Sequence, residues 1–355
     1  MIDVLQWEDI KANYSGGAIV LGNGSSIAIS SKFSYDSLFD EAKRKGFISS
    51  SVQRVFDKFD VTDFELVLRR LWQAKQVNDA LGIEHGLVED SYKQVRSALI
   101  ETIRATHATY EDAEPHLEHI YKFLKQFKTV ISLNYDLIVY WAAMYGNREL
   151  GRWFKDCFVS NVFSSDWDTY REPYGADGAT LYFYPHGNLV LKRHGFSSAK
   201  KIKAGNETSL LASILSKWEE QDLAPVFVCE GTKDLKENSI ASCDYLERVY
   251  YEVMPSLEST LVIYGWGIWE QDEHLLKQVA KAKPTKVAVS VYQNNQTYIG
   301  RVRKHLVDIG VEDIVFFDSE SSGVWNQPST EYIEAQKAAG ETTQEALQRL
   351  FKRKG

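Results

Sequence analysis

The fold of this chain is decided by the stretch Gly17-Ala18-Ile19-Val20-Leu21-Gly22-Asn23-Gly24-Ser25-Ser26. Its first part is a short apolar run ending in glycine, which is typical of a strand buried on both faces in a parallel sheet. Its second part is a glycine-rich turn, where the backbone bends tightly and N–H groups at a helix start can face an anion. The stretch therefore predicts a first core strand that ends at a binding turn.

Later apolar runs predict further strands of the same sheet. They cover residues 129–133, 180–184, 225–229, 261–264, 286–291 and 314–317. Apolar residues at helical spacing over 246–254, 272–282 and 298–309 separate most of the later runs. Strands that alternate with helices predict a doubly wound, parallel, Rossmann-like α/β sheet.

The first two strands are separated by a long stretch with helical periodicity. Because an ordinary crossover is much shorter, we interpret residues 35–128 as an inserted helical module. The sheet domain would then comprise residues 1–34 and 129–326. Residues 327–355 are polar and rich in alanine and glutamate, which predicts a C-terminal helix or tail.

Composition excludes several classes of protein. The chain has 355 residues and a net charge of -8, so it lacks the basic field that attracts nucleic acid. Its first residues lack the pattern of a signal peptide and its apolar runs are too short to cross a bilayer, so we expect it to be cytoplasmic. Its three cysteines, Cys157, Cys229 and Cys243, form no Cys-x-x-Cys pair, which argues against a zinc ribbon.

Polar residues follow two of the predicted strands, at the sheet edge where α/β proteins bind ligands. Asn134 and Asp136 come directly after one strand, and His186 follows another. Each also has a structural interpretation, because Asn and Asp often cap a following helix and a lone histidine is usually structural. Their common position at strand ends favours a binding or catalytic site.

Two common nucleotide motifs do not fit the turn. Ile27 stands where a dehydrogenase fingerprint needs a third glycine, and no acid follows on a second strand. A P-loop is excluded because no Gly-Lys-Ser/Thr follows the turn.

At these positions the sequence resembles the sirtuin superfamily. Gly22-Asn23-Gly24-Ser25-Ser26, Ser132-Leu133-Asn134-Tyr135-Asp136 and His186-Gly187 match three motifs of its NAD site, in order. Ile263-Tyr264-Gly265-Trp266-Gly267 resembles its later glycine loop, and Asp272-Glu273-His274 resembles an Asp-x-His motif. The likeness is greatest to bacterial sirtuin-like proteins, many of them NAD hydrolases in phage defence. It covers the sheet and not the helical insertion.

The resemblance implies NAD as substrate or ligand, with no metal. It implies that Asn134 holds the attacking water, that His186 is the general base, and that Asp136 recognises the nicotinamide amide or fixes the site. The Gly22–Ser26 turn would receive the phosphates, and Gly265, Trp266 and Gly267 would lie near the adenosine half. Leu133 replaces a glutamine of the family and zinc cysteines are absent, which disfavours protein deacylation.

Several alternatives remain open at this point. His194, in a second His-Gly pair, competes with His186 as the base, although it resembles the polar end of a hairpin. His116 and His119 have the spacing of a helical metal site, but an exposed polar helix face is the simpler interpretation. Trp266 and Trp269 would either stack on adenine, close the pocket or belong to the core.

The function also has alternatives. The same pocket would serve a non-catalytic sensor of NAD or ADP-ribose, with the inserted helices signalling to a protein partner. Nucleoside or phosphoribosyl transfer on a related fold is a third class. Assembly into a homo-oligomer is compatible with each of these functions.

Overall fold

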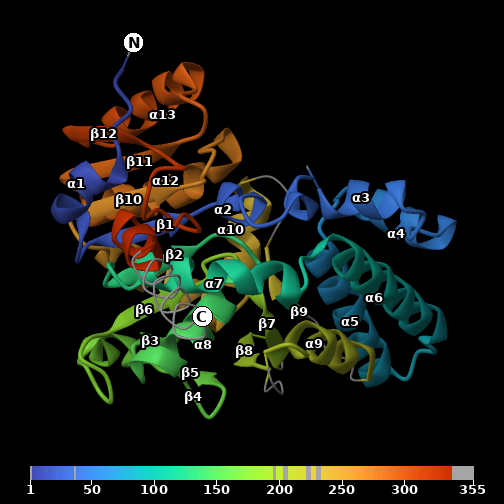
Figure 1. The fold of residues 1–355 in the computed structure, drawn as a ribbon. Helices are drawn as coiled ribbons and strands as arrows, with labels where there is room; N and C mark the ends of the chain where they lie inside the picture. The colour runs from blue at the N-terminus through green and yellow to red at the C-terminus, as the bar shows by residue number, and fades with distance from the viewer. Residues whose placement is uncertain are drawn as a thin grey trace, which may run out of the picture.

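The computed structural model of the chain describes residues 2–35, 37–194, 197–202, 207–220, 225–228 and 233–337. At its centre lies a seven-stranded sheet with the order β12-β11-β10-β1-β2-β6-β3 (Figure 1). Its strands are β1 Ala18–Leu21, β2 Thr129–Ser132, β3 Phe154–Lys155, β6 Thr180–Phe183, β10 Thr260–Tyr264, β11 Lys286–Val291 and β12 Asp313–Asp318. Every strand pairing in this sheet is parallel, which confirms the predicted doubly wound α/β fold.

The strand order creates a switch point beside β1. All residues of β1, β2 and β6 are buried, as expected for strands with helices on both faces. Val20 of β1 lies opposite Ile263 of β10 on one side and Ile131 of β2 on the other. After β1, the chain therefore first forms the strands on one side of it, including β2 and β6, and then forms β10, β11 and β12 on the other side. In such sheets a ligand crevice forms where the order reverses, here between β1 and β10.

Among the described residues between β1 and β2 there are helices and no strand. These helices are α2 Asn23–Ile27, η1 Ser31–Phe33, α3 Leu38–Arg44, α4 Ser50–Phe59, α5 Phe64–Leu81, α6 Gly86–Thr106 and α7 Tyr110–Leu124. Helices α3 to α6 lie beside the sheet (Figure 1), whereas α7 packs onto it through Phe123, whose ring lies 5.4 Å from Trp7 and 6.0 Å from Tyr264. The large helical insertion is thus confirmed, while its limits at residues 35 and 128 stay a prediction.

A second, antiparallel sheet corrects one predicted strand. It has the order β4-β5-β8-β7-β9, with β4 Phe158–Val159, β5 Val162–Phe163, β7 Gly187–His194, β8 Ser198–Lys201 and β9 Pro225–Phe227. The prediction that 225–229 joins the parallel sheet was wrong, because β9 pairs antiparallel with β7. An apolar run of this length does not reveal which sheet will bury it. Phe227 is buried here against Trp218 and Tyr135, and Cys229 lies outside the described residues.

The remaining helices include those predicted in the second half. They are α1 Trp7–Tyr14, α8 Ile138–Leu150, η2 Trp167–Arg171, α9 Leu210–Glu220, α10 Lys233–Ala241, α11 Asp244–Arg248, η3 Val249–Val253, η4 Met254–Ser256, η5 Glu270–Asp272, α12 Glu273–Ala282 and α13 Gln296–Asp308. Residues 330–337 are also helical, and Tyr332 packs on α7 against His119 and Lys122. The rest of the predicted C-terminal helix lies outside the described residues.

The helical insertion is attached to the second sheet by a buried ion pair. Arg193 Nη2 of β7 lies 2.8 Å from Glu65 Oε1 of α5, and the two side chains are 4% and 2% exposed. Arg193 Nη1 also donates to the Ser242 carbonyl at 2.7 Å. A buried pair of this kind is costly to break, because removal of one partner leaves the other charge in a dry environment.

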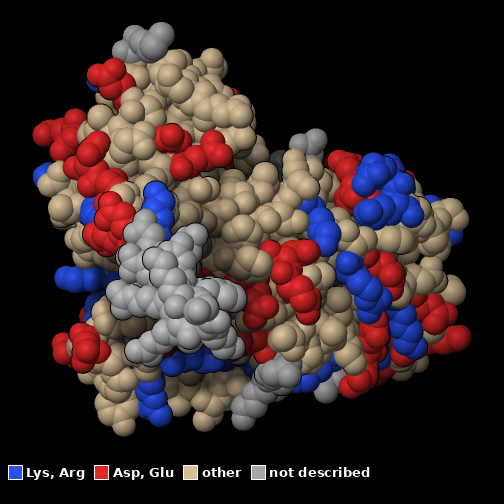
Figure 2. All heavy atoms as spheres, in the orientation of Figure 1, with Lys and Arg blue, Asp and Glu red and all other residues tan. Residues whose placement is uncertain are grey.

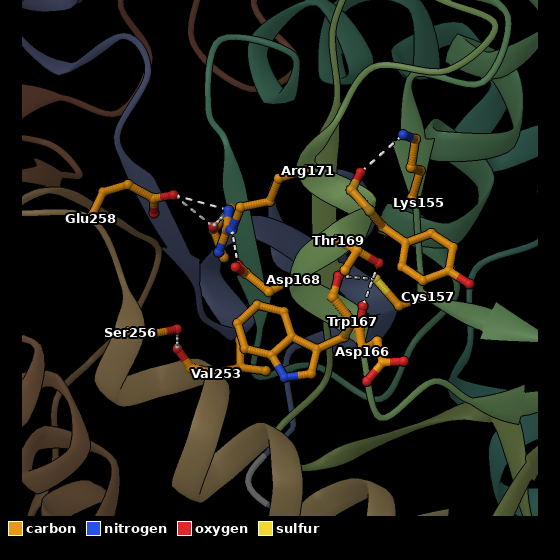
Figure 3. Close-up of polar contacts among 12 residues, drawn as sticks. Lys155, Cys157, Asp166, Trp167, Asp168, Thr169, Arg171, Val253, Ser256 and Glu258 are labelled. Atoms are coloured by element: carbon orange, nitrogen blue, oxygen red, sulfur yellow. Dashed lines mark hydrogen bonds and ion pairs between the residues drawn. The ribbon is translucent and has the colours of Figure 1, made fainter.

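A structural cluster around η2 is drawn in Figure 3. Arg171 of η2 donates to Thr129 Oγ1 at 2.9 Å and to Glu258 Oε1 at 3.2 Å, so it ties η2 to the start of β2. The Cys157 thiol points to the Trp167 carbonyl, and burial raises the pKa of this thiol. Protonated and buried, Cys157 has the environment of a structural cysteine rather than a nucleophile.

Charged side chains of both signs share the surface of the inserted helices. On the face drawn in Figure 2, Lys and Arg are interspersed with Asp and Glu over α3 to α6. Salt bridges such as Lys93–Glu89 at 2.9 Å connect neighbouring turns there. Within the described ranges, the helices are all too short or too polar to cross a membrane.

Candidate functional site

Two glycine loops meet at the switch point. The turn Gly22–Ser26 follows β1, and the loop Gly265–Gly267 follows β10. Gly22 N donates to the Tyr264 carbonyl at 2.9 Å, and Gly24 N donates to the Gly265 carbonyl at 2.8 Å. The expectation that these N–H groups face a pyrophosphate is therefore corrected for Gly22 and Gly24. Their hydrogen bonds are used to join the two loops.

The glycines are needed because the loops touch backbone to backbone. A Cβ on Gly22 would lie 2.5 Å from Trp266 Cα, closer than real Cβ contacts. Gly265 has φ +65°, and a Cβ there would lie 2.4 Å from Ser25 N. Tight loop packing thus accounts for glycines that the sequence alone assigned to phosphate binding.

Asn134 connects the end of β2 to the turn after β1. Its Nδ2 lies 3.1 Å from the Gly22 carbonyl, 3.0 Å from Ser25 Oγ and 2.8 Å from Ser26 Oγ. The side chain is almost fully buried, and its nitrogen is engaged by these three acceptors. Asn134 therefore holds the shape of the turn instead of capping the next helix, and its oxygen is the atom left for a ligand or water.

Asp136 makes both a structural contact and a contact with the turn. Its Oδ1 accepts from Ile138 N at 2.9 Å, as the capping interpretation expects. Its Oδ2 accepts from the hydroxyl of Ser26. Burial raises the pKa of this carboxyl, although both hydrogen bonds favour its ionised form. Asp136 thus fixes the position of the turn relative to the start of α8.

His186 follows β6 and lies beside a second histidine. Its Nε2 is 3.0 Å from Nε2 of His274, which comes from α12. Both rings are buried, and burial, together with the nearby Lys236 charge, lowers the pKa of His186. The local sequence around His186 does not indicate this partner. His274 was singled out only by the Asp-x-His motif at residues 272–274.

Asn134, Asp136 and His186 line one pocket of about 170 Å³. Tyr35 and Leu38, at the start of the insertion, form part of its wall. Strand-end position therefore did predict which polar residues come together. The insertion contributes to the pocket, which sequence reasoning left undecided.

A larger pocket of about 700 Å³ lies on the other side of the turn, lined by Gly24, Gly265, Trp266, Gly267 and neighbouring aromatic residues. Trp266 is buried and donates from Nε1 to Asp272 Oδ2 at 2.9 Å. Trp269 is 52% exposed, and the Arg301 guanidinium lies 3.6 Å from its ring centroid. Both tryptophans thus line this pocket, and Arg301 adds a positive charge that the sequence did not single out.

The competing histidines lie elsewhere. His194 is exposed and pairs with Ser198 in the β7–β8 hairpin, in agreement with the hairpin interpretation. His116 and His119 are on α7, and the His119 ring packs 4.9 Å from the ring of Tyr332. In the part of the chain that the structure describes, no group of three or more His, Cys, Asp or Glu side chains is placed to hold a metal ion.

A family model described as a domain of unknown function (DUF4917) matches residues 19–325. The chain belongs to this family. The match extends from β1 to beyond β12, so the helices between β1 and β2 lie inside the DUF4917 domain. Most of the residues that line the two pockets also lie inside it. No curated protein matches the chain.

Proposed function

We propose that this DUF4917 protein is a sirtuin-like protein that binds NAD and hydrolyses the bond between nicotinamide and ribose. The observation that carries the proposal is the grouping of Asn134, Asp136 and His186 in one small pocket next to the glycine turn. Residues from two strand ends meet there, at the edge where doubly wound sheets bind nucleotides.

The two pockets suit the two halves of a dinucleotide. Asn23 lines the small pocket and Gly24 the large one, so a ligand that filled both would cross the turn between these neighbours. The larger pocket has the volume and aromatic walls for adenosine, and the smaller one would hold the nicotinamide ribose. Because Gly22 N and Gly24 N are engaged, we assign phosphate pairing to Arg301, a charge that favours bidentate contacts.

In this proposal water replaces nicotinamide at the ribose carbon. The carbon–nitrogen bond breaks with its electron pair leaving on nicotinamide, and the ribosyl centre gains oxocarbenium character. The water oxygen forms the new bond and its proton passes to His186, whose neutral form is favoured by burial. Asn134 would orient the water through Oδ1, because its Nδ2 is already occupied.

The test is nicotinamide release by the purified full chain incubated with NAD and followed by chromatography. His186→Ala should lower the rate by roughly 10²- to 10⁴-fold, the usual contribution of a general base. Asn134→Ala should lower it as well, and His194→Ala, which changes an exposed histidine, should leave it unchanged. Release that survives in both site variants would contradict the assignment.

A second candidate is a sensor that binds NAD or ADP-ribose without turnover. It is favoured by the contact between the pocket and the insertion, where the Tyr35 hydroxyl bonds to the hydroxyl of Tyr135. A ligand beside Asn134 would therefore act directly on the start of the inserted helices. Saturable NAD binding without nicotinamide release, measured by calorimetry on the same protein, would favour this function over hydrolysis.

A further inference from the structure

The contact between His186 and His274 has no role in the steps above. Their Nε2 atoms are 3.0 Å apart, and the rings lie 19° from parallel with centroids 5.2 Å apart. His186 comes from the side of the sheet built first, and His274 from α12, which follows β10. The pair therefore bridges the two halves of the fold, and His186 lines the small pocket.

Two hydrogen bonds indicate the tautomers of the pair. His274 Nδ1 lies 3.0 Å from the Gln271 carbonyl, and since a carbonyl only accepts, this nitrogen carries a proton. The contact between the two Nε2 atoms needs a second proton. A neutral His274 that carries its proton on Nδ1 can only accept at Nε2, so His186 Nε2 donates in this contact. In the neutral pair each ring supplies one proton to these two contacts, which leaves Nδ1 of His186 unprotonated.

We propose that His186 and His274 form one proton-accepting pair, in which His274 is a positioning residue that fixes the orientation and tautomer of His186. In its catalytic part this inference rests on the proposed hydrolysis. The proton that leaves the attacking water is taken up by Nδ1 of His186, so positive charge moves onto the pair and nothing is oxidised or reduced.

In the described part of the chain, charged and titratable groups surround the pair. They come from four elements and are Asp136, Lys236, Tyr250 and Asp272. Burial is the main cause that lowers the pKa of His186, and the Lys236 charge adds to it. Asp272 Oδ1 lies 3.8 Å from Lys236 Nζ and offsets part of that charge. The Tyr250 hydroxyl donates to the His274 carbonyl at 2.9 Å, which holds the start of α12 in place.

The pair is tested first without reference to NAD. Long-range ¹H–¹⁵N spectra of histidine-labelled protein report the tautomer and titration of each ring. In the wild type we expect His274 protonated at Nδ1, and the signals of both rings changing together during a pH titration. In His274→Gln the titration of His186 should shift and lose this coupling. An unchanged tautomer and titration of His186 would overturn the pair, whether or not the chain cleaves NAD.

Kinetics then test the catalytic part. His274→Gln should lower kcat by roughly 10- to 100-fold, a fraction of what a general base contributes, with KM little changed and the acid limb of the pH profile displaced. Gln278→Ala, at another buried position of α12, is the control for packing loss and should keep the wild-type pH profile. Equal pH profiles in His274→Gln and wild type would overturn the positioning role. Coupled titration in a protein that releases no nicotinamide would support the pair and reject hydrolysis.

Discussion

The contact between the two glycine loops makes Gly265→Ala the most informative stability variant. An alanine at φ +65° costs about 1–2 kcal/mol, because its Cβ crowds the backbone in the left-handed region. The same Cβ would lie 2.4 Å from Ser25 N, and forced overpacking costs about 1–3 kcal/mol. Because one substitution combines both effects, we expect the free energy of unfolding to fall by about 2–5 kcal/mol.

Three other glycines separate these effects. Gly82 has φ +66° with nothing within 4 Å of its Cβ position. Gly82→Ala should therefore lower the free energy of unfolding only by the backbone strain, about 1–2 kcal/mol. Gly22 has φ −107°, but its Cβ position lies 2.5 Å from Trp266 Cα. Gly22→Ala should therefore lower the free energy of unfolding only through overpacking. Gly300 lies within α13 in open space, and Gly300→Ala should stabilise the chain by roughly 0.5–1 kcal/mol.

The measurement is urea unfolding followed by circular dichroism and by tryptophan fluorescence. Coincident transitions with the two probes justify a two-state free energy. The reasoning fails if Gly265→Ala lowers the free energy of unfolding no more than Gly82→Ala does, because the two glycine loops would then not be in contact. An unchanged free energy of unfolding in Gly22→Ala would independently contradict the close packing of the two loops.

Two further predictions concern buried ionisable groups. Glu65→Gln should lower the free energy of unfolding by about 3–5 kcal/mol, because Arg193 keeps a buried charge without its partner. Arg104→Gln, at an exposed pair, should lower it by at most about 1 kcal/mol. Equal losses for the two variants in urea unfolding would contradict this prediction. Burial lowers the pKa of His107 to about 4, and its Nε2 accepts from Leu137 N at 3.1 Å. Its contribution to stability is complete above the unfolded pKa of about 6.5 and is lost as the pH falls through about 4, by at most roughly 3 kcal/mol. His107→Gln should flatten urea-measured stability over that pH range, and an unchanged slope would refute this origin.

The sequence predicted the parallel sheet well because its strands are short apolar runs between helices, a local property. It failed at residues 225–229, where the described part of the run is β9, a buried strand of the second sheet that packs against a helix. The grouping of Asn134, Asp136 and His186 was predictable, since parallel strands end at one edge. The donor role of Asn134 was not predictable, because three acceptors from the turn after β1 had to be brought to it.

What the sequence by itself determined is therefore the local framework: the strands, the glycine turn and the large stretch of helices between β1 and β2. The tertiary structure alone decided how this framework makes a site. His186 and His274 are 88 residues apart, and they meet only because β6 and α12 pack around the same sheet. The glycines of the turn, which the sequence assigned to a ligand, are required by a loop that follows β10. In both cases the deciding contacts join distant segments, and their geometry depends on packing that no local pattern encodes.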